Sequence, residues 1–228
     1  MTAPLFRPVA DTGLLVEFGV HASPATLAKV RQLDAALRRH GFPGFRESVP
    51  AMVNLLVLFD PLVIGHVGAE AHLRGLIRDA AGVSDGRTTR QVDICYEDDL
   101  APDLAAVAAA CGLAPAAVIA AHLSGDYAVA MYGFAPGYAY LTGVPAPLHL
   151  PRKPAARRAV PAGSVIIAGA QCLVTTLTMP TGWWIIGRSP TAILRDDPAR
   201  PFLFEVGDKL RFRRIDRADF ESSSRGET

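Results

Sequence analysis

The chain has 228 residues, of which 50% are hydrophobic and 20% are charged, and its formal net charge is +1. This length accommodates one large domain or two small ones, and the apolar content predicts a globular protein with a well-buried core. The balanced charge gives no indication of a nucleic-acid-binding protein.

The beginning of the chain and the cysteines indicate the cellular compartment of the protein. The first residues, MTAPLFRPVADTG, include no apolar signal-peptide core, and no apolar run in the sequence reaches the roughly 18 residues that a membrane span needs. Cys95, Cys111 and Cys172 are odd in number and lack metal-ligand or Cys-x-x-Cys spacing, which favours a reducing cytosol. We therefore expect a cytoplasmic protein that contacts no membrane.

The first part of the chain alternates between strand and helix signals. Ser23 followed by Pro24 is typical of a helix start, and Gly41 stands where that helix is expected to end. A second helix is expected from His66 to Ala81, and strands are expected at 14–20, 45–49, 53–59 and 89–96. The order β-α-β-β-α-β predicts a ferredoxin-like domain over residues 1–98.

The rest of the chain is expected to form a second domain over residues 99–220. Residues 102–123 have an alanine-rich helical pattern. After Gly125, short β-like runs alternate with glycines and prolines, which predicts a closed or barrel-like β domain. The polar end, residues 221–228, is expected to be frayed. The expected fold class is therefore α+β.

Several common enzyme signatures are missing from the sequence. There is no phosphate-binding loop, because none of the three lysines follows a glycine, and there is no GxGxxG, HExxH or GxSxG motif. If the protein handles a nucleotide, it does so without these motifs.

Residues 133–145 combine glycine, proline and aromatic side chains without a charge. Tyr138 and Tyr140 share a face if the segment is extended, and the glycines permit close backbone approach. Just upstream, His122 and Ser124 stand at the end of a predicted helix. One interpretation makes the aromatic residues core and His122 a surface residue at the helix end. The other makes this stretch the wall of a pocket.

Two further clusters are candidates for binding. Arg152, Lys153, Arg157 and Arg158 lie between prolines, where guanidinium groups suit a carboxylate or phosphate, although a solvated loop is the favoured interpretation of a bare charge run.

The last cluster lies in residues 170–190. Gln171 follows a Gly-Ala turn and could present its amide to a substrate, while Trp183 and Trp184 point to opposite faces of a strand. Cys172 has no demonstrable base partner, so a small buried thiol is favoured over a nucleophile.

Taken together and in order, these clusters resemble the family of the B subunit of bacterial 5-oxoprolinase, also called allophanate hydrolase subunit 1 or the KipI family, which also forms part of the carboxyltransferase region of urea carboxylase. The likeness spans most of the chain. The matching residues are His122, Ser124, Tyr127, GFAPGYAYL at 133–141, Pro151 and Arg152, Arg157, VPAGSV at 160–165, Gln171, Gly182 and Trp183, and IGRS at 186–189.

The resemblance implies a small α/β domain followed by a cyclophilin-like β-barrel. It implies ATP-driven opening of 5-oxo-L-proline to L-glutamate, with ATP and Mg used by a complex that also contains a C-type and an A-type subunit. No metal is expected on this chain. The implied catalytic residues are His122 as acid or base, Arg157, and Gln171 bonded to the amide. The implied substrate-binding residues are Ser124, Phe134, Pro136, Gly137, Tyr138, Tyr140, Arg152, Trp183 and Arg188.

The family leaves two alternatives open: a KipI-like inhibitor of a sensor histidine kinase, and an amidolyase subunit of the allophanate hydrolase or urea carboxylase type. The chain also departs from the family pattern in one stretch. Relatives usually have Gln-Thr-Gly at the position of Gln171, Tyr-Pro near residues 175 and 176, and Gly-Gly-Trp before the first tryptophan. Cys172, Thr175, Thr176 and Thr181 stand at these departures, which leaves the substrate open.

Overall fold

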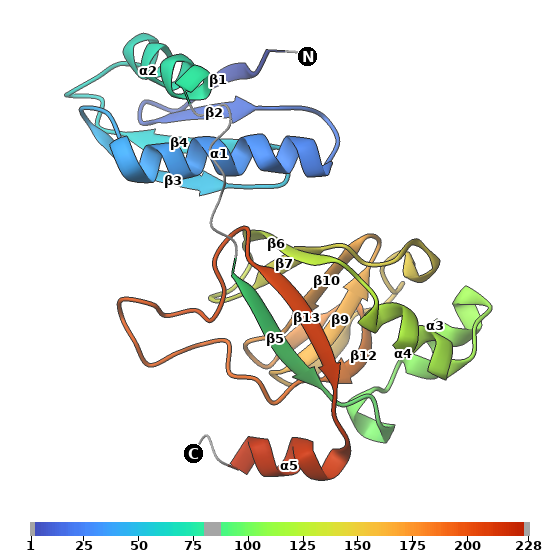
Figure 1. The fold of residues 1–228 in the computed structure, drawn as a ribbon. Coiled ribbons are helices and arrows are strands. Elements are labelled where there is room, and N and C mark those ends of the chain that lie inside the picture. Colours follow the sequence, from blue (N-terminus) through green and yellow to red (C-terminus); the bar gives the residue numbers. More distant parts are fainter. Residues whose placement is uncertain (1–2, 80–87, 226–228) are drawn as a thin grey trace. The chain divides into compact units, whose positions relative to one another are not determined.

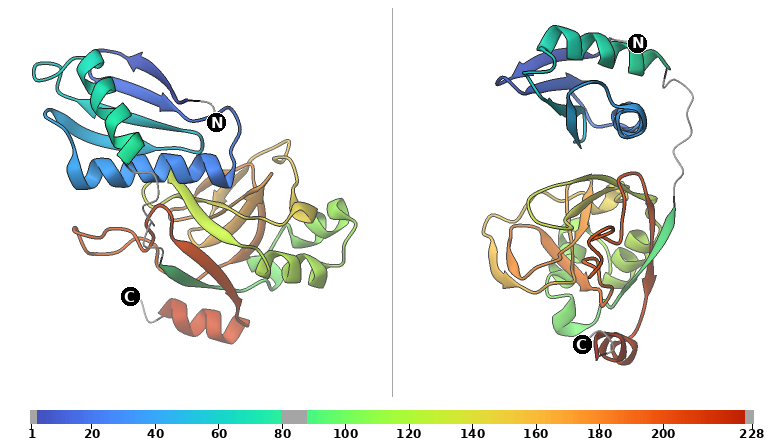
Figure 2. Two further views of the ribbon diagram at one scale, coloured as in Figure 1. Left: turned by 45° about the horizontal axis from the view of Figure 1, so that its top comes forward. Right: turned by 90° about the vertical axis from the view of Figure 1, so that its left-hand side faces the viewer.

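The computed structural model describes residues 3–79 and 88–225, and the chain divides into two compact units, Met1–Gly86 and Arg87–Thr228 (Figures 1 and 2). Each unit has its own sheet and its own hydrophobic core. The division falls earlier in the chain than the domain boundary expected between residues 98 and 99.

The first unit is a four-stranded antiparallel sheet with two helices. The strand order is β1-β2-β4-β3. The elements are β1 (Leu5–Val9), β2 (Gly13–Glu17), α1 (Pro24–His40), β3 (Phe45–Pro50), β4 (Asn54–Phe59) and α2 (His66–Asp79).

Capping residues define the ends of α1 as the sequence predicts. Ser23 Oγ accepts a hydrogen bond from the backbone N–H of Thr26 at 3.0 Å, which satisfies a free donor of the first turn. Gly41 ends the helix with φ +52°, and its N–H donates to the carbonyl of Leu37.

Alternate residues of β2 and β4 pack with both helices in one core: Leu14, Val16, Val30, Leu33, Leu37, Leu55, Val57, Phe59, Ala69 and Leu73.

The architecture is mixed α+β as expected, but the ferredoxin-like strand order is wrong in two places. The unit begins with an extra strand, β1, which pairs with β2. Its sequence, LFRPV, contains Pro8 and is mostly exposed, so it lacks the apolar alternation by which strands are recognised. The strand expected at 89–96 forms β5 (Thr89–Ile94), which pairs in parallel with β13 (Lys209–Arg214) of the second unit.

The second unit is built around a seven-stranded sheet in the order β12-β9-β10-β7-β6-β13-β5. Short helices and a separate two-stranded sheet of β11 and β8 accompany it. Its other elements are η1 (Asp98–Leu100), α3 (Leu104–Cys111), α4 (Pro115–Leu123), β6 (Tyr127–Tyr132), β7 (Ala139–Thr142), η2 (Ala146–Leu148), β8 (Arg157–Val160), β9 (Ser164–Ala168), β10 (Gln171–Val174), β11 (Met179–Thr181), β12 (Trp184–Arg188) and α5 (Arg217–Arg225).

The two edges of this sheet meet in an isolated antiparallel bridge. Cys95 N donates to the carbonyl of Arg188 at 2.8 Å, and Arg188 N donates to the carbonyl of Cys95 at 2.9 Å. This pair joins the end of β5 to the end of β12, so the sheet nearly closes on itself (Figure 1). The sequence-based expectation of a barrel-like β domain agrees with this arrangement.

Strands β9 and β10 bury apolar residues on both faces. Val165, Ile167 and Cys172 belong to the larger cluster, here called the barrel core, which also includes residues of α3 and α4. Ile166 and Leu173 point the other way because side chains alternate along a strand. The second cluster, here called the aromatic face, consists of Tyr138, Val160, Ile166, Ala168, Leu173, Trp183 and Ile185.

The end of the chain is more ordered than its composition suggests. Residues 221–225 were expected to be frayed but form the last part of α5, while 226–228 lie outside the described residues. In the described parts of the chain, no single helix is long and apolar enough to cross a membrane, and α3 and α4 reach that length only as a pair bent by 92°.

The seam of the barrel leaves no room for a side chain at Gly187. A Cβ there would lie 2.7 Å from Ile94 Cδ1 and 2.9 Å from the carbonyl oxygen of Cys95. We expect Gly187→Ala to lower the free energy of unfolding of the second unit by about 1–3 kcal/mol, because the added carbon must push β5 away from β12. Urea denaturation followed by tryptophan fluorescence measures it, since both tryptophans lie in this unit.

Gly182→Ala is the matched control, because the nearest atom to a Cβ at that position is the Lys153 carbonyl oxygen at 3.9 Å. Its effect should stay within about 0.5 kcal/mol. Equal losses of stability in the two variants would contradict the role assigned to the seam.

Candidate functional site

Strand register brings several of the expected site residues to the aromatic face. Gln171 pairs with Thr142 of β7 and with Ala168 of β9. Because Cys172 points into the barrel core, its neighbour Gln171 points to the opposite face. Tyr140 lies on that same face, two residues before Thr142 and packed against the aromatic cluster.

The aromatic rings form the centre of this face. The Tyr140 and Trp183 rings meet edge to face, with centroids 5.9 Å apart, and the Arg152 guanidinium lies over the Trp183 ring at 5.7 Å. Tyr138 is 4% exposed, and this burial raises the pKa of its phenol to about 12. The Tyr138 phenol therefore remains a protonated hydrogen-bond donor near neutral pH.

Three polar side chains of the expected site have no hydrogen-bonding or ionic partner within the described chain. The Gln171 amide, the Arg152 guanidinium and the Arg157 guanidinium make no side-chain hydrogen bond or ion pair with another described residue. Both arginines are exposed, and Arg157 pairs through its backbone with Thr181 across the β8–β11 ladder. Such groups are free to bind an anion and an amide from solution.

The loop before β7 is held in an unusual conformation. Phe134 has φ +73° and is 74% exposed, and its ring lies near that of Tyr138 with centroids 5.6 Å apart. Gly137 has φ +71°, and a Cβ there would lie 2.8 Å from Leu194 Cδ2. The left-handed backbone conformation of Gly137 therefore favours glycine.

Pro136 also has an anchoring contact. Its carbonyl accepts a hydrogen bond from Thr176 Oγ1 at 2.6 Å. The sequence-based expectation placed Pro136 and Gly137 against the substrate. In the structure the Pro136 carbonyl is bonded to Thr176, and Gly137 lies close to Thr176 and Leu194.

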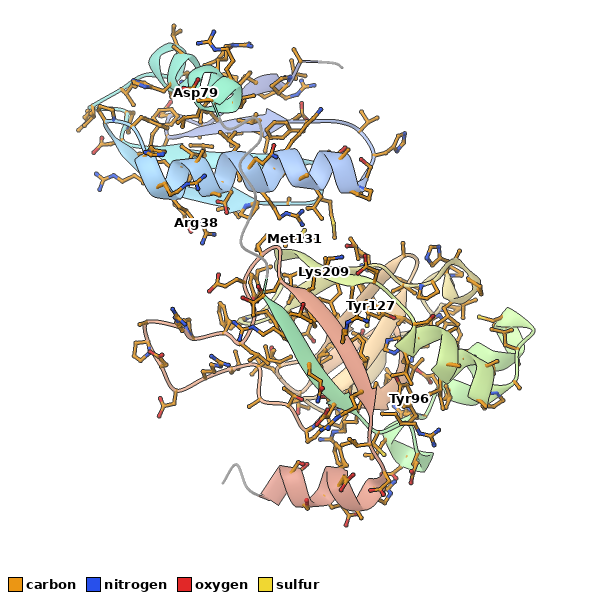
Figure 3. All side chains as sticks on the ribbon, viewed as in Figure 1. Arg38, Asp79, Tyr96, Tyr127, Met131 and Lys209 are labelled. Carbon is orange, nitrogen blue, oxygen red and sulfur yellow. The ribbon has the colours of Figure 1, made fainter. Side chains whose placement is uncertain are left out.

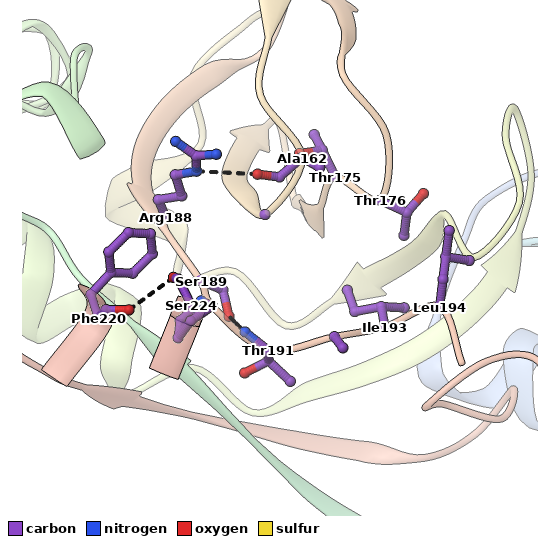
Figure 4. A pocket seen from close by; sticks show the side chains of 13 residues that line it. Ala162, Thr175, Thr176, Arg188, Ser189, Thr191, Ile193, Leu194, Phe220 and Ser224 are labelled. Carbon is purple, nitrogen blue, oxygen red and sulfur yellow. Dashed lines mark hydrogen bonds between the residues drawn. The ribbon is translucent and has the colours of Figure 1, made fainter. Parts of the chain in front are cut away.

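A pocket of about 290 Å³ opens beside this loop (Figure 4). Its walls are the turn at 162–163, Thr175 and Thr176, the segment 188–194, and Phe220 and Ser224 of α5. Of the expected site residues, Arg188 alone lines it.

Arg188 is held in place inside this pocket. Its Nε donates to the carbonyl of Ala162 at 3.1 Å, and its guanidinium lies 6.0 Å from the ring centroid of Phe220. The contribution of α5 was not predicted from the sequence, since a polar chain end gives no sign of packing against a pocket. Ser189 and Thr191 were also missed, although Ser189 belongs to the quoted IGRS motif.

His122 lies in the barrel core and not at the surface. Its ring is fully buried between Tyr96, Tyr127 and Phe212; Figure 3 labels the two tyrosines. Nδ1 shares a hydrogen bond of 2.8 Å with Tyr96 Oη, and Nε2 lies 3.5 Å from Cys172 Sγ. Burial lowers the pKa of His122 to about 3.

The acid–base role expected for His122 therefore finds no support in this conformation, because a neutral ring closed off from solvent cannot exchange protons with a substrate. Ser124 lies apart from the aromatic face as well: it is at the end of α4, and its hydroxyl donates to the Ala121 carbonyl at 2.8 Å.

Cys172 is likewise fully buried, and burial raises the pKa of its thiol. A protonated, enclosed thiol is a packing residue, as the sequence suggests. Among residues 3–79 and 88–225, no group of three or more His, Cys, Asp or Glu side chains is placed to hold a metal ion.

The chain matches the family model for the carboxyltransferase domain, subdomain C and D, over residues 4–204. It is 33% identical to the B subunit of 5-oxoprolinase from Bacillus subtilis over 225 residues, which cover 94% of both chains. It is 34% identical to the B subunit of 5-oxoprolinase from Escherichia coli O157:H7 over 207 residues, or 90% of this chain and 93% of the relative. These matches confirm the family resemblance found in the motifs.

Solved structures give the same relationship. The crystal structure of TTHA0988 has a TM-score of 0.79 and 34% identity over 90% of this chain, which spans only 40% of that longer chain. A conserved protein from Pyrococcus horikoshii has a TM-score of 0.56 and 33% identity, covering 95% of this chain and 100% of its own. The Kluyveromyces lactis urea amidolyase matches 96% of this chain with 15% of its own, at a TM-score of 0.75 and 18% identity, which shows the fold alone.

The burial of neutral His122 predicts a pH-dependent stability. Below its usual pKa of 6.5 the unfolded chain takes up a proton that the folded chain does not accept until about pH 3. The free energy of unfolding should therefore fall by about 1.4 kcal/mol per pH unit from this residue as the pH drops through that window. In His122→Asn, urea denaturation at a series of pH values should show a smaller slope of the free energy of unfolding against pH. The difference corresponds to one proton fewer taken up on unfolding. Parallel slopes for the variant and the natural chain would contradict this burial.

Proposed function

This chain belongs to the family of carboxyltransferase domains, subdomain C and D, and on that basis we propose that it is the B subunit of an ATP-dependent 5-oxoprolinase. The complex opens 5-oxo-L-proline to L-glutamate, and this chain is inactive alone. The observation that carries the proposal is the 33% identity to the B subunit of a 5-oxoprolinase over 94% of both chains. The partners are a C-type and an A-type subunit.

The chemistry explains why ATP is needed. A lactam is a resonance-stabilised amide whose opening is unfavourable, so the reaction is coupled to ATP hydrolysis: 5-oxo-L-proline, ATP and two water molecules give L-glutamate, ADP and phosphate. Transfer of a phosphoryl group to the amide oxygen makes the ring carbon electrophilic enough for water to attack. The chain's own task is to bind and orient the lactam.

Three kinds of group among the expected site residues support this task. Half-buried Tyr140 offers aromatic surface to a small ring, and Trp183, which is only 6% exposed, packs against it. The unpartnered Gln171 amide offers both a donor and an acceptor to a secondary lactam amide. Arg152 and Arg157 are unpaired cations suited to the substrate carboxylate. Together they match a small, flat, anionic amide.

The Mg-bound ATP used by the complex needs residues that this chain does not supply through a recognisable motif. The sequence has no phosphate-binding loop, and the described residues include no acidic or histidine cluster for a metal ion. We assign the metal site to the assembled complex, and the substrate contacts above to this chain.

Arg157, which pairs with β11, should be important for activity, whereas its neighbour Arg158 should not be. In the assembled complex, Arg157→Ala should lower kcat/KM for 5-oxo-L-proline by about 10- to 100-fold, through loss of a charge-assisted bond to the carboxylate. Arg158→Ala removes the same charge from the adjacent exposed position and should change kcat/KM by less than about twofold. Unchanged activity in Arg157→Ala would remove that residue from the site.

The function itself is tested by reconstitution. The chain is purified with its A-type and C-type partners, and ATP-dependent release of glutamate from 5-oxo-L-proline is measured with and without it. Activity that depends on the chain supports the proposal. An associated, folded complex without activity overturns it, and urea and allophanate are then the next substrates to try. A chain that binds a sensor histidine kinase instead of these subunits also overturns it.

A further inference from the structure

The pocket beside the seam has its own set of hydrogen-bond donors, separate from the aromatic face (Figure 4). Arg188 uses only Nε within the described chain, in its bond to the Ala162 carbonyl, so both terminal nitrogens remain available. A guanidinium held in this way presents a planar pair of N–H donors in a fixed direction.

Two hydroxyls in the same pocket also keep a free proton. Ser189 Oγ accepts from the backbone N–H of Thr191 at 3.1 Å, and Thr191 Oγ1 accepts from the backbone N–H of Asp93 at 3.3 Å. Neither hydroxyl donates to another described residue. Ser189 is only 4% exposed, so a bound group is the natural acceptor for its proton.

The other pocket hydroxyls already donate hydrogen bonds to backbone carbonyls. Thr175 Oγ1 donates to the Pro161 carbonyl at 2.9 Å, Thr176 Oγ1 donates to Pro136, and Ser224 Oγ donates to the Phe220 carbonyl at 2.8 Å. The donor set of the pocket is therefore Arg188, Ser189 and Thr191.

No carboxylate among the described residues lines the pocket to neutralise this set. The nearby Asp99 has its pKa lowered mainly by its hydrogen bond to Arg217 and, to a smaller extent, by the charge of Arg188. Asp99 is highly exposed and ion-paired with Arg217, so the Arg188 cation lacks a bonded counter-ion of its own within the described chain.

The donors are fixed by the backbone around them. Arg188 is held by the bridge to Cys95 at the seam. Ser189 N donates to the Gly163 carbonyl at 2.8 Å, and a Cβ on Gly163 would lie 2.4 Å from the Ser189 carbonyl oxygen. Gly163 has φ +81°, so only glycine permits this approach. A rigid donor set loses little entropy when a ligand binds.

We propose that this pocket binds a phosphate oxyanion, either inorganic phosphate or a phosphoryl group of ATP. A guanidinium and two hydroxyls with free protons offer enough donors for several oxygens of a tetrahedral anion, whereas a planar carboxylate needs only the guanidinium. The pocket also adjoins the loop that carries Tyr138, through Thr176 and Leu194. Naming ATP as a source rests on the proposed function; the anion site itself does not.

The test is direct binding to the whole chain, without partner subunits or turnover. Inorganic phosphate, ATP and acetate are titrated separately and followed by calorimetry. We expect saturable phosphate or ATP binding that Arg188→Gln weakens by about tenfold or more and Ser189→Ala by several-fold. Arg211→Gln, which removes an exposed charge on β13 outside the pocket, should leave affinity unchanged. Circular dichroism checks folding, and Arg188→Lys, which keeps the charge, should restore part of the affinity.

Each outcome decides the proposal. Tighter binding of ATP than of inorganic phosphate, with the same dependence on Arg188, identifies the nucleotide as the source, and the reverse order identifies free phosphate. Absence of saturable binding of both overturns the proposal, as does equal weakening by Arg211→Gln. Acetate binding as tight as phosphate at the same residues shows a carboxylate site instead and also overturns it. Because this experiment measures binding and no reaction, its result does not depend on whether the complex has oxoprolinase activity.

Discussion

Two backbone hydrogen bonds between Cys95 and Arg188 hold together the edges of a sheet whose strands come from distant parts of the chain. β5 stands at the beginning of the unit and pairs with β13 near its end, while β12 returns to meet β5 at the seam. The position of Arg188, and with it the position of Ser189 in the pocket, follows from this closure. Gly187 must be small because the strands approach so closely there.

Closure of the sheet also separates two sets of side chains on the same strands. On β10, Cys172 and Gln171 are neighbours in sequence but belong to opposite faces, one packed near His122 and the other beside the aromatic cluster. The departure from the family pattern at Cys172 therefore concerns the core. The departures at Thr175 and Thr176 lie in the pocket wall, where both hydroxyls donate to backbone carbonyls.

Local signals in the sequence predicted local structure well. Ser23 and Gly41 define α1 because capping depends on a few adjacent residues. Strand partners depend on contacts far along the chain, so the sequence pattern of β5 could not show that it pairs with β13. Several motif residues do gather in the aromatic face, but a histidine in an apolar helix looks alike whether it is buried or catalytic, and His122 proved to be buried. The pocket draws on α5, which has no recognisable motif.

The central claim, that the lactam binds on the aromatic face, can be tested with the two adjacent tryptophans. Trp183 lies in that face under Arg152, while Trp184 packs against the barrel core and donates from Nε1 to the Pro151 carbonyl at 2.8 Å. With 5-fluorotryptophan in this chain of the assembled complex, fluorine NMR reports on each ring during addition of 5-oxo-L-proline. We predict a saturable shift of the Trp183 resonance with the Trp184 resonance unchanged. A shift of Trp184 alone, or of neither resonance while the complex turns over substrate, would contradict the account.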